Sequence, residues 1–258
     1  MILSRRVALG GVQLDELHDA IVIRGVDTGV THNTTGAVSR MGGFGQRVTG
    51  EHWDSLDVSV KFAIDIPKKQ MEERKAVFDA VIAWARRKGW LTFSYMTNRR
   101  LFVDSVVYPS AGDAWDWTNE YAITFRAYNV PFWTEEIPNQ AVIDLSSGGR
   151  TWIDVNGNVD SVLDVTFQNR SGMEIPNFTV TANGNTISLT GIALGGSETL
   201  TISHGTDGLL RIFAGSRSVY ANYTGADDLF VQPGRLPVDF SATRAGRLTV
   251  QSSGRWIG

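Results

Sequence analysis

Apolar and polar residues alternate strictly from Leu56 to Ile64, in the segment LDVSVKFAI. Successive side chains of a β-strand point to opposite faces, so this period predicts a strand with one buried and one solvated face. A helix is predicted to follow it. Pro67 suits the first helical residue, because its missing N–H needs no partner there, and Gly89 suits the left-handed residue that ends a helix.

The helix between Pro67 and Gly89 is expected to bury one broad apolar face. Arg74 interrupts this face, and we expect its aliphatic stem to lie along the helix while its guanidinium reaches water. The residues expected on the face are Met71, Val77, Phe78, Val81, Ile82, Trp84 and Ala85, whereas Glu72, Asp79, Ala83 and Arg87 fall outside it.

Most of the remaining chain has the pattern of strands and turns. Before residue 131 we expect strands at Ala20–Val26, Leu91–Tyr95, Leu101–Tyr108 and Tyr121–Val130. After residue 140 the strands are short and no helix is predicted; alternation marks Leu163–Phe167, Phe178–Val180, Ile187–Leu189, Leu200–Ile202, Leu236–Phe240 and Leu248–Val250. Asn183-Gly184 predicts a two-residue hairpin, and many short strands at regular spacing are typical of a β-sandwich.

The pattern of residues changes between Pro131 and Gln140, a stretch that contains two prolines and has no apolar–polar periodicity. Such a stretch indicates a domain junction. We therefore expect an N-terminal β domain with an inserted helix over residues 1–134 and a β-sandwich over residues 139–258. The fold class is mainly β with one α-helix.

Two segments are candidate interfaces. Gly36 to Gly50 is rich in glycine, which predicts a mobile loop, and a partner is expected to cover its Met41 and Phe44; Arg47 is counted with them. Trp115 and Trp117 lie at the tip of an expected hairpin. Exposed tryptophans often anchor interfaces, although both could instead fold back on the neighbouring domain.

Composition narrows the function classes. The chain has 258 residues, 42% of them hydrophobic and 20% charged, so it can bury a core. Its net charge of -3 disfavours broad nucleic-acid binding, and the absence of cysteine excludes disulfides and thiolate metal sites. Because no apolar run could span a bilayer, no membrane insertion is expected.

No catalytic or cofactor-binding constellation stands out, so we expect neither an enzyme nor a bound cofactor or metal. None of the four histidines has a second histidine within four residues, and we expect them at surface or turn positions: His18, His32, His52 and His204. Asp154–Asp160 resembles the start of a calcium loop, but Val159 and Val165 occupy its glycine and glutamate positions. A turn between strands is the expected structure there. Carboxylates are numerous, but no pair shows the arrangement of a glycosidase site.

The order of these elements resembles the distal tail protein of long-tailed, non-contractile (siphovirus-type) bacteriophages. The resemblance covers essentially the whole chain and is one of order and texture. It is carried by the strand–helix–strand run Ser55–Tyr95 with Val77–Trp84 and Gly89–Phe93, by Arg99–Val103, by Tyr121–Ala127 running into Pro131-Phe132-Trp133, and by Val231–Val238 with its proline-glycine turn.

This resemblance implies a structural subunit of the phage tail tip, made in the bacterial host cytoplasm and carried on the virion. Its N-terminal, tail-tube-like domain would form a hexameric ring that joins the tail-tube protein to baseplate or receptor-binding proteins. DNA would pass through the channel without specific binding. The C-terminal domain would be a galectin-like β-sandwich. The family has no catalytic residues to carry over.

Two alternatives remain. A tail-tube protein would share the N-terminal fold, and a carbohydrate-binding surface protein would use the sandwich and its aromatic residues. An enzyme, such as a cell-wall hydrolase, would need a site that the sequence does not show.

Overall fold

The alternating segment lies within the long strand β5 (Gln46–Ile64). Its apolar side chains from Leu56 to Ile64 are buried, as predicted. Leu56 to Ala63 pair with β9 (Glu120–Ala127), and Ser59 to Ile64 pair on the other edge with β3 (Ile21–Asp27). β5 is therefore the centre of the N-terminal sheet.

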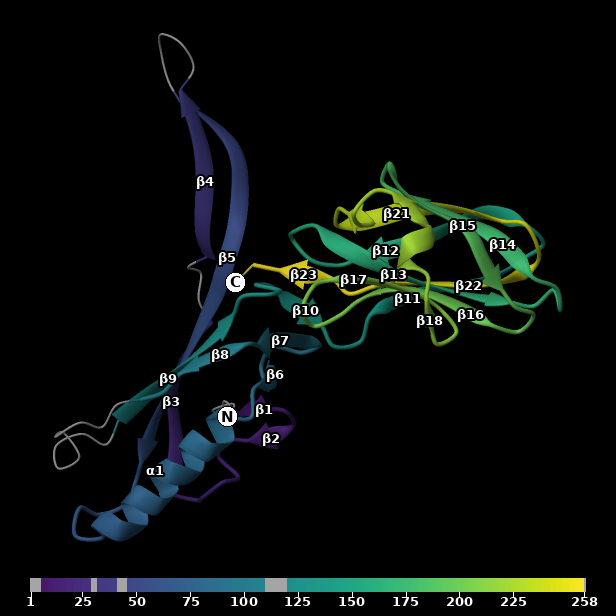
Figure 1. Cartoon of the computed structure of the whole chain (residues 1–258). Coiled ribbons are helices and arrows are strands. Elements are labelled where there is room, and N and C mark those ends of the chain that lie inside the picture. Colours follow the sequence, from purple (N-terminus) through teal and green to yellow (C-terminus); the bar gives the residue numbers. More distant parts are fainter. Residues whose placement is uncertain (1–5, 29–31, 41–45, 110–119, 258) are drawn as a thin grey trace. The chain divides into compact units, whose positions relative to one another are not determined.

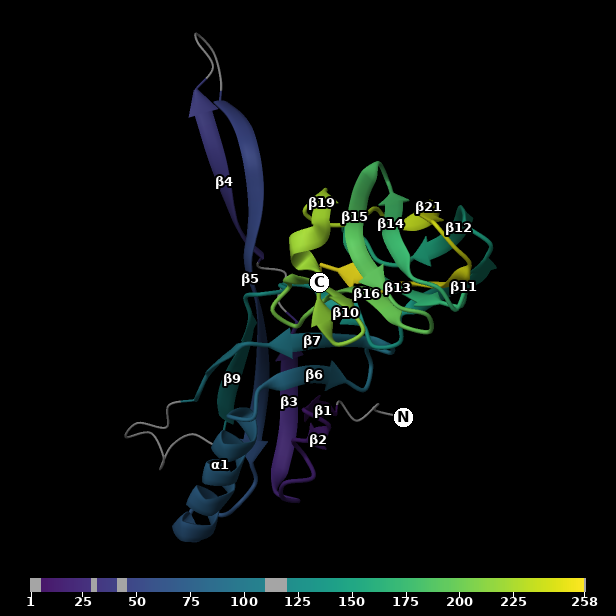
Figure 2. The same cartoon turned by 45° about the vertical axis from the view of Figure 1, so that its right-hand side comes forward.

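The computed structural model describes residues 6–28, 32–40, 46–109 and 120–257, and for residues 32–40 and 46–54 it describes the backbone alone (Figures 1 and 2). The chain divides into two compact units. The first comprises the chain up to Trp133 together with Ile257, and the second comprises Thr134–Trp256. The described strands form four antiparallel sheets, and the fold is mainly β with one α-helix in this part of the chain.

The first unit holds α1 and parts of two sheets. One sheet has the order β3-β5-β9-β8, with β4 paired to β5, and the strands β2-β1-β6-β7 belong to a second sheet whose order continues with β10 and β23. The remaining bounds in this unit are β1 (Val7–Leu9), β2 (Val12–Gln13), β4 (His32–Arg40), α1 (Met71–Ala85), β6 (Gly89–Phe93), β7 (Arg99–Val103) and β8 (Ser105–Val107).

Helix α1 begins at Met71, so the prediction of Pro67 as the first helical residue is wrong. Pro67 instead opens a turn, in which the Pro67 carbonyl accepts a hydrogen bond from the Gln70 amide at 2.9 Å. Charge explains the later start. Glu72 and Glu73 lie in the first turn, where the positive end of the helix dipole favours carboxylates, whereas the lysines before Gln70 would be disfavoured there. Gly89 has a φ of 107°, as expected for a left-handed residue after the helix, but it begins β6.

The apolar face of α1 packs on the β5–β9 sheet as predicted. Val77, Phe78, Val81, Trp84 and Ala85 are buried, and Met71 and Ile82 are half-buried; Glu72, Asp79, Ala83 and Arg87 are exposed. The Trp84 indole meets Phe125 edge-on, with ring centroids 5.8 Å apart, and its Nε1 donates to the Val12 carbonyl at 2.8 Å.

Arg74 does not reach water, contrary to prediction. It is fully buried, and its Nη2 donates to the Tyr121 hydroxyl at 3.3 Å. The phenol of Tyr121 lies between Phe62 and Phe78, with ring centroids 5.5 and 5.1 Å away. Arg74 is therefore held inside the helix–sheet core by a buried hydroxyl acceptor.

The prediction of a mobile loop over Gly36–Gly50 is also wrong for most of its length. Residues up to Arg40 belong to β4 and residues from Gln46 belong to β5, and the two strands pair from His32↔Leu56 to Arg40↔Gln46. Glycine content indicated a loop, but cross-strand backbone hydrogen bonds form whether or not a side chain is present. Residues 41–45 lie outside the described part.

The predicted strand Leu101–Tyr108 is two strands in different sheets. β7 ends at Val103 and β8 starts at Ser105. Asp104 lies between them. Its carboxylate accepts hydrogen bonds from the Tyr128 and Asn129 amides at 2.8 and 3.0 Å, and its own amide donates to the Arg126 carbonyl at 2.9 Å. These bonds fix the corner at which the chain changes sheets.

The second unit is a sandwich of two sheets, with orders β11-β22-β13-β16-β17-β18 and β12-β21-β14-β15-β19; β20 pairs with β13. Their bounds are β11 (Asn139–Leu145), β12 (Gly148–Val155), β13 (Ser161–Asn169), β14 (Ile175–Ala182), β15 (Asn185–Leu194), β16 (Thr199–His204), β17 (Leu210–Ala214), β18 (Arg217–Ser218), η2 (Tyr220–Asn222), β19 (Tyr223–Gly225), β20 (Phe230–Val231), β21 (Gly234–Ala242) and β22 (Gly246–Ser252).

One apolar core fills the sandwich, where the inward residues of β13 and β14 meet as Phe167 against Phe178, with ring centroids 5.1 Å apart. The predicted Asn183-Gly184 hairpin joins β14 to β15, with φ of 49° and 79°. Positive φ at both positions is what a tight hairpin turn requires.

The entry and exit of this unit are tied together. In β10 (Trp133–Glu135), the amide of Glu135 donates to the Gly254 carbonyl at 3.0 Å, and its carboxylate accepts from the Gly254 amide at 2.9 Å. The same side chain accepts a hydrogen bond from Asn156 Nδ2 at 2.6 Å. Glu135, which is buried, thus joins the first strand of the unit to the segment that leads into β23 (Arg255–Trp256).

We expect Trp84→Ala to lower the free energy of unfolding of the first unit by about 3–5 kcal/mol, because it leaves a cavity and an unpaired Val12 carbonyl. Hydrogen exchange at β5 and β9 amides under increasing urea reports this unit. The exposed Lys75→Ala on the same helix is the control and should change stability by less than about 0.5 kcal/mol. Equal effects of the two substitutions would contradict the packing described.

Candidate functional site

The most prominent feature of the first unit is a two-stranded ribbon. β4 pairs with the N-terminal half of β5, and the other neighbours of β5 begin only at Leu56 and Ser59. Over the ten residues from Gln46 to Ser55, β4 is therefore the only described strand that pairs with β5. They span roughly 33 Å at the usual rise of a strand, and Figures 1 and 2 show this ribbon extending beyond the sheet that carries it.

Of the five residues predicted as interface contacts, the structure describes only the backbone of one. Met41, Phe44, Trp115 and Trp117 lie outside the described residues. Arg47 lies in β5 opposite Ser39, but its side chain is not described. The structure therefore leaves these five contacts as predictions.

The β3-β5-β9-β8 sheet ends in two edge strands. β3 pairs only with β5, and β8 only with β9, among the described strands. Apolar side chains gather at the β8 edge, where Val107 and Tyr108 are 44% and 39% exposed. Unpaired edges of this kind can add main-chain hydrogen bonds to a neighbouring chain.

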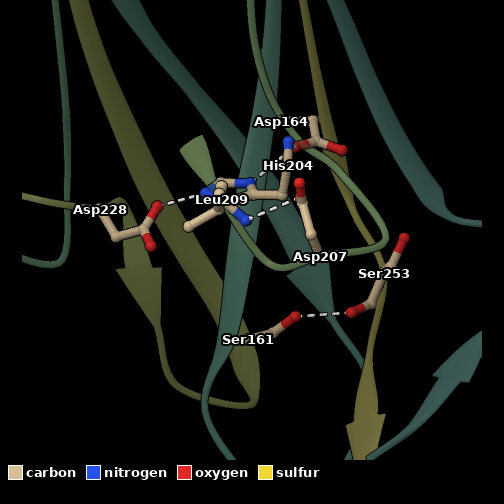
Figure 3. Close-up of polar contacts among 7 residues, drawn as sticks. All are labelled: Ser161, Asp164, His204, Asp207, Leu209, Asp228 and Ser253. Carbon is tan, nitrogen blue, oxygen red and sulfur yellow. Dashed lines mark hydrogen bonds and ion pairs between the residues drawn. The ribbon is translucent and has the colours of Figure 1, made fainter. Parts of the chain in front are cut away.

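In the second unit, His204 is the centre of a half-buried cluster of charged groups that the sequence did not predict. His204 ends β16, Asp164 lies on β13, and Asp228 precedes β20 (Figure 3). Imidazole Nδ1 lies 2.9 Å from Asp164 Oδ1, and Nε2 contacts Asp228 Oδ1. The backbone amide of His204 also donates to Asp164 Oδ1, at 3.0 Å. The expectation of a surface or turn histidine is wrong here, because only 8% of this side chain is exposed.

This geometry favours the charged imidazole. A neutral ring has one N–H, so one of its nitrogens would direct a lone pair at a carboxylate, whereas the protonated ring donates to both. Burial on its own lowers the pKa of His204, but the hydrogen bonds and charges of Asp164 and Asp228 outweigh it and raise the pKa to about 9.

The arrangement suits a structural ion cluster better than catalysis. Both ring nitrogens are occupied by carboxylates, so neither is free to take a proton from a nucleophile. Asp164 and Asp228 lie at opposite nitrogens of the ring and do not converge on a common point. Within the described ranges, no group of His, Cys, Asp and Glu side chains could hold a metal ion.

Arg255 adds a second positive charge near the two aspartates. Burial lowers the pKa of its guanidinium, and the charges of Asp228 and Asp164 oppose this effect. The backbone of Arg255 also contacts Asp154–Asp160, the segment whose sequence resembles the start of a calcium loop. The Asn158 amide donates to the Arg255 carbonyl at 2.9 Å, and Gly157, with φ of 118°, approaches so closely that a Cβ would lie 2.2 Å from that carbonyl oxygen. Asp154–Asp160 is thus a connection between β12 and β13 that is fastened to the last strand.

One signal in the sequence could have placed His204 in the interior. Leu200 and Ile202 alternate inward on β16, and His204 continues their period. Its partners could not have been inferred, because Asp164 and Asp228 are 40 and 24 residues away.

No helix among the described residues has the length and apolar character needed to cross a bilayer.

The stability of the second unit should fall at alkaline pH. The folded-state pKa of His204 lies above the unfolded value of 6.5, so its contribution is complete below pH 6.5 and is lost as the pH rises through about 9. The loss should reach up to about 3 kcal/mol. We expect His204→Gln to remove this pH dependence, and His18→Gln in the first unit to retain it. Hydrogen exchange at β13 and β16 amides between pH 6 and pH 10 measures both; a wild-type profile that matches His204→Gln would contradict the ion cluster.

Comparison with known proteins rests on structure, because no protein-family model and no curated protein matches the sequence. The chain is similar to the SPP1 Dit (gp 19.1) protein, which is described as a paradigm of the hub adsorption apparatus in phages that infect Gram-positive bacteria. The TM-score is 0.66 at 10% identity, over 97% of this chain and 98% of that chain.

Chains from the phage p2 baseplate are also similar. For the activated conformation with Sr the TM-score is 0.51 at 7% identity, over 96% of this chain and 97% of that chain. With Ca it is 0.52 at 6% identity, over 97% and 98%. Over nearly its whole length, the chain therefore shares the fold of the SPP1 distal tail protein and of a phage baseplate component.

Proposed function

We propose that this chain is a structural subunit of a phage tail tip, forming a hexameric ring that joins the tail tube to the baseplate or receptor-binding apparatus. The observation that carries the proposal is the nearly full-length similarity in fold to SPP1 Dit, a hub protein by its description. Both units of this chain contribute to that match, since it covers 97% of the residues. The protein would reside at the tail tip of the virion.

The β4–β5 ribbon supports assembly through copies of the chain. A two-stranded ribbon on its own is marginally stable in water. Here β4 is the only described strand that pairs with β5 between Gln46 and Ser55, so a neighbour that covers this part would stabilise the ribbon. The open edges β3 and β8 supply two different surfaces on one sheet. A contact between different surfaces is head-to-tail and closes into a ring when its rotation permits.

The two units would have different roles in this assembly. Residues 1–134 would be the ring-forming, tail-tube-like domain, and residues 139–258 the galectin-like sandwich that faces tail-tip or baseplate proteins. The ribbon and the open edges all belong to the first unit, which supports its role as the ring former. A tail-tube protein is the alternative, but the second unit, of about equal size, favours a tip component.

DNA would pass through the channel of the ring without specific contacts. The net charge of -3 supports this role, because a strongly basic wall would hold phosphates and slow passage. We propose no enzymatic activity, no cofactor and no membrane insertion. The occupied nitrogens of His204 are consistent with a structural protein.

Native mass spectrometry of the full chain should give a hexamer, and shortening the ribbon should give monomers. Asn33 and Ser55 are directly opposite each other, so Asn-Gly in place of residues 34–54 would join them by a tight turn. The pairing of β5 with β3 and β9 would remain. Tyr220→Ala, at an exposed residue of the second unit, is the control and should stay hexameric. A monomeric parent chain at high concentration, or a shortened variant that still forms the ring, would contradict the proposal.

The tip of the ribbon should contribute to the same assembly. We expect Phe44→Asp to weaken ring formation at least tenfold, because covering one large apolar side chain is worth about 1.5–3 kcal/mol and burying a carboxylate there adds a penalty. Protease cleavage within residues 41–45 should be slow in rings and fast in the variant. The conservative Phe44→Leu is the matched control; equal cleavage in all three proteins would count against a covered tip.

A further inference from the structure

The outer face of one sheet of the sandwich carries an exposed tryptophan among paired charges. Trp152 on β12 is 49% exposed and lies opposite Pro237 of β21. The guanidinium carbon of Arg235 lies 5.9 Å from the indole centroid. About half of Trp152 is exposed, so part of the indole can contact a ligand.

The charges around Trp152 balance. Arg150, two residues before it on β12, donates to both carboxylate oxygens of Asp239, at 2.7 and 2.9 Å. Asp154, two residues after Trp152, lies opposite Arg235. Two cations and two carboxylates therefore surround one indole, and the patch as a whole carries no net charge.

The sheet continues from this patch without any ionisable side chain on its next two strands. β14 and β15 contain no Asp, Glu, Lys, Arg or His. Asp239 pairs with Thr181, and Thr181 pairs with Thr186, whose hydroxyl oxygens are 2.8 Å apart. In Figure 2 the strands β12, β21, β14 and β15 follow one another in this order. In the neighbouring outward row, Ser241 pairs with Thr179 and Thr179 pairs with Ser188, so this row also carries hydroxyl groups.

We propose that this face, from Trp152 to the threonines of β14 and β15, binds a neutral saccharide. The C–H face of a pyranose ring is apolar and can stack on the exposed part of the indole. Sugar hydroxyls both donate and accept hydrogen bonds. They can therefore pair with the free lone pairs of Asp239, with the N–H groups of Arg150 and with the threonine hydroxyls, which also act in both roles.

A protein partner fits this surface less well. The core of a protein–protein interface is apolar, with polar residues at its rim. Here Trp152 and Pro237 are the apolar pair, and the residues next to them are charged or hydroxylated. A patch without net charge also offers no net electrostatic attraction to an anionic polymer. The proposal does not depend on ring formation.

Affinity electrophoresis of the full chain in gels that contain dextran, β-1,4-galactan or laminarin tests the proposal, with polygalacturonate as the charged comparison. We expect at least one neutral polysaccharide to retard the protein. Trp152→Ala should raise the apparent dissociation constant at least tenfold. Trp152→Tyr should retain part of the binding, because it keeps an aromatic ring. Tyr220→Ala, which removes an exposed aromatic ring elsewhere in the same unit, should leave it unchanged.

Several results would overturn the proposal. They are no retardation by any of the three neutral polysaccharides, retardation by polygalacturonate alone, or equal retardation of the parent chain and Trp152→Ala. A change in oligomeric mass caused by Trp152→Ala would assign the surface to a protein contact. Circular dichroism of each variant shows whether it is folded, and Trp152→Tyr keeps the test informative if Trp152→Ala is not.

Discussion

The first unit depends on the pairing of β5. Its C-terminal half has neighbours on both edges and buries every apolar residue from Leu56 to Ile64, so it anchors α1 and the sheet. Its N-terminal half pairs with β4 alone in the described chain. One strand thus serves the core of its own unit at one end and extends away from that core at the other. The strand therefore continues from the core into the ribbon without an intervening loop.

The period of apolar side chains predicted those elements that bury one face and expose the other. The alternation of β5 and β9 and the buried face of α1 all emerged from the sequence, because one face of each packs against a neighbour. Pairing through backbone hydrogen bonds alone imposes no such period on the side chains. β4 and the first part of β5 contain glycine and lack a clear period, so their sequence predicts a loop where the structure has strands. The separation of β7 from β8 depends on one carboxylate, Asp104, whose hydrogen bonds reach more than twenty residues along the chain.

The polar clusters were least accessible to prediction. His204 needs Asp164 and Asp228, and Trp152 acquires its surroundings only when β21 pairs beside β12 in a particular register. In both cases the partners come from strands that are distant in sequence. The two clusters differ in exposure. At His204 the imidazole is nearly buried and its charge is paired with two carboxylates, which suits a structural role, whereas around Trp152 the ionic groups are solvated and leave an aromatic ring exposed.

Glu135 has a wider implication. Glu135 lies where the chain enters the sandwich, and Gly254 lies where the chain leaves it. Hydrogen bonds between these two residues hold the entry and the exit next to each other. A module whose two ends meet in this way can be exchanged for another module with adjoining ends, and the scaffold that holds it need not adjust its spacing. Residues 136–253 therefore form a segment with adjoining ends, which is the arrangement that tolerates exchange or insertion of a domain best.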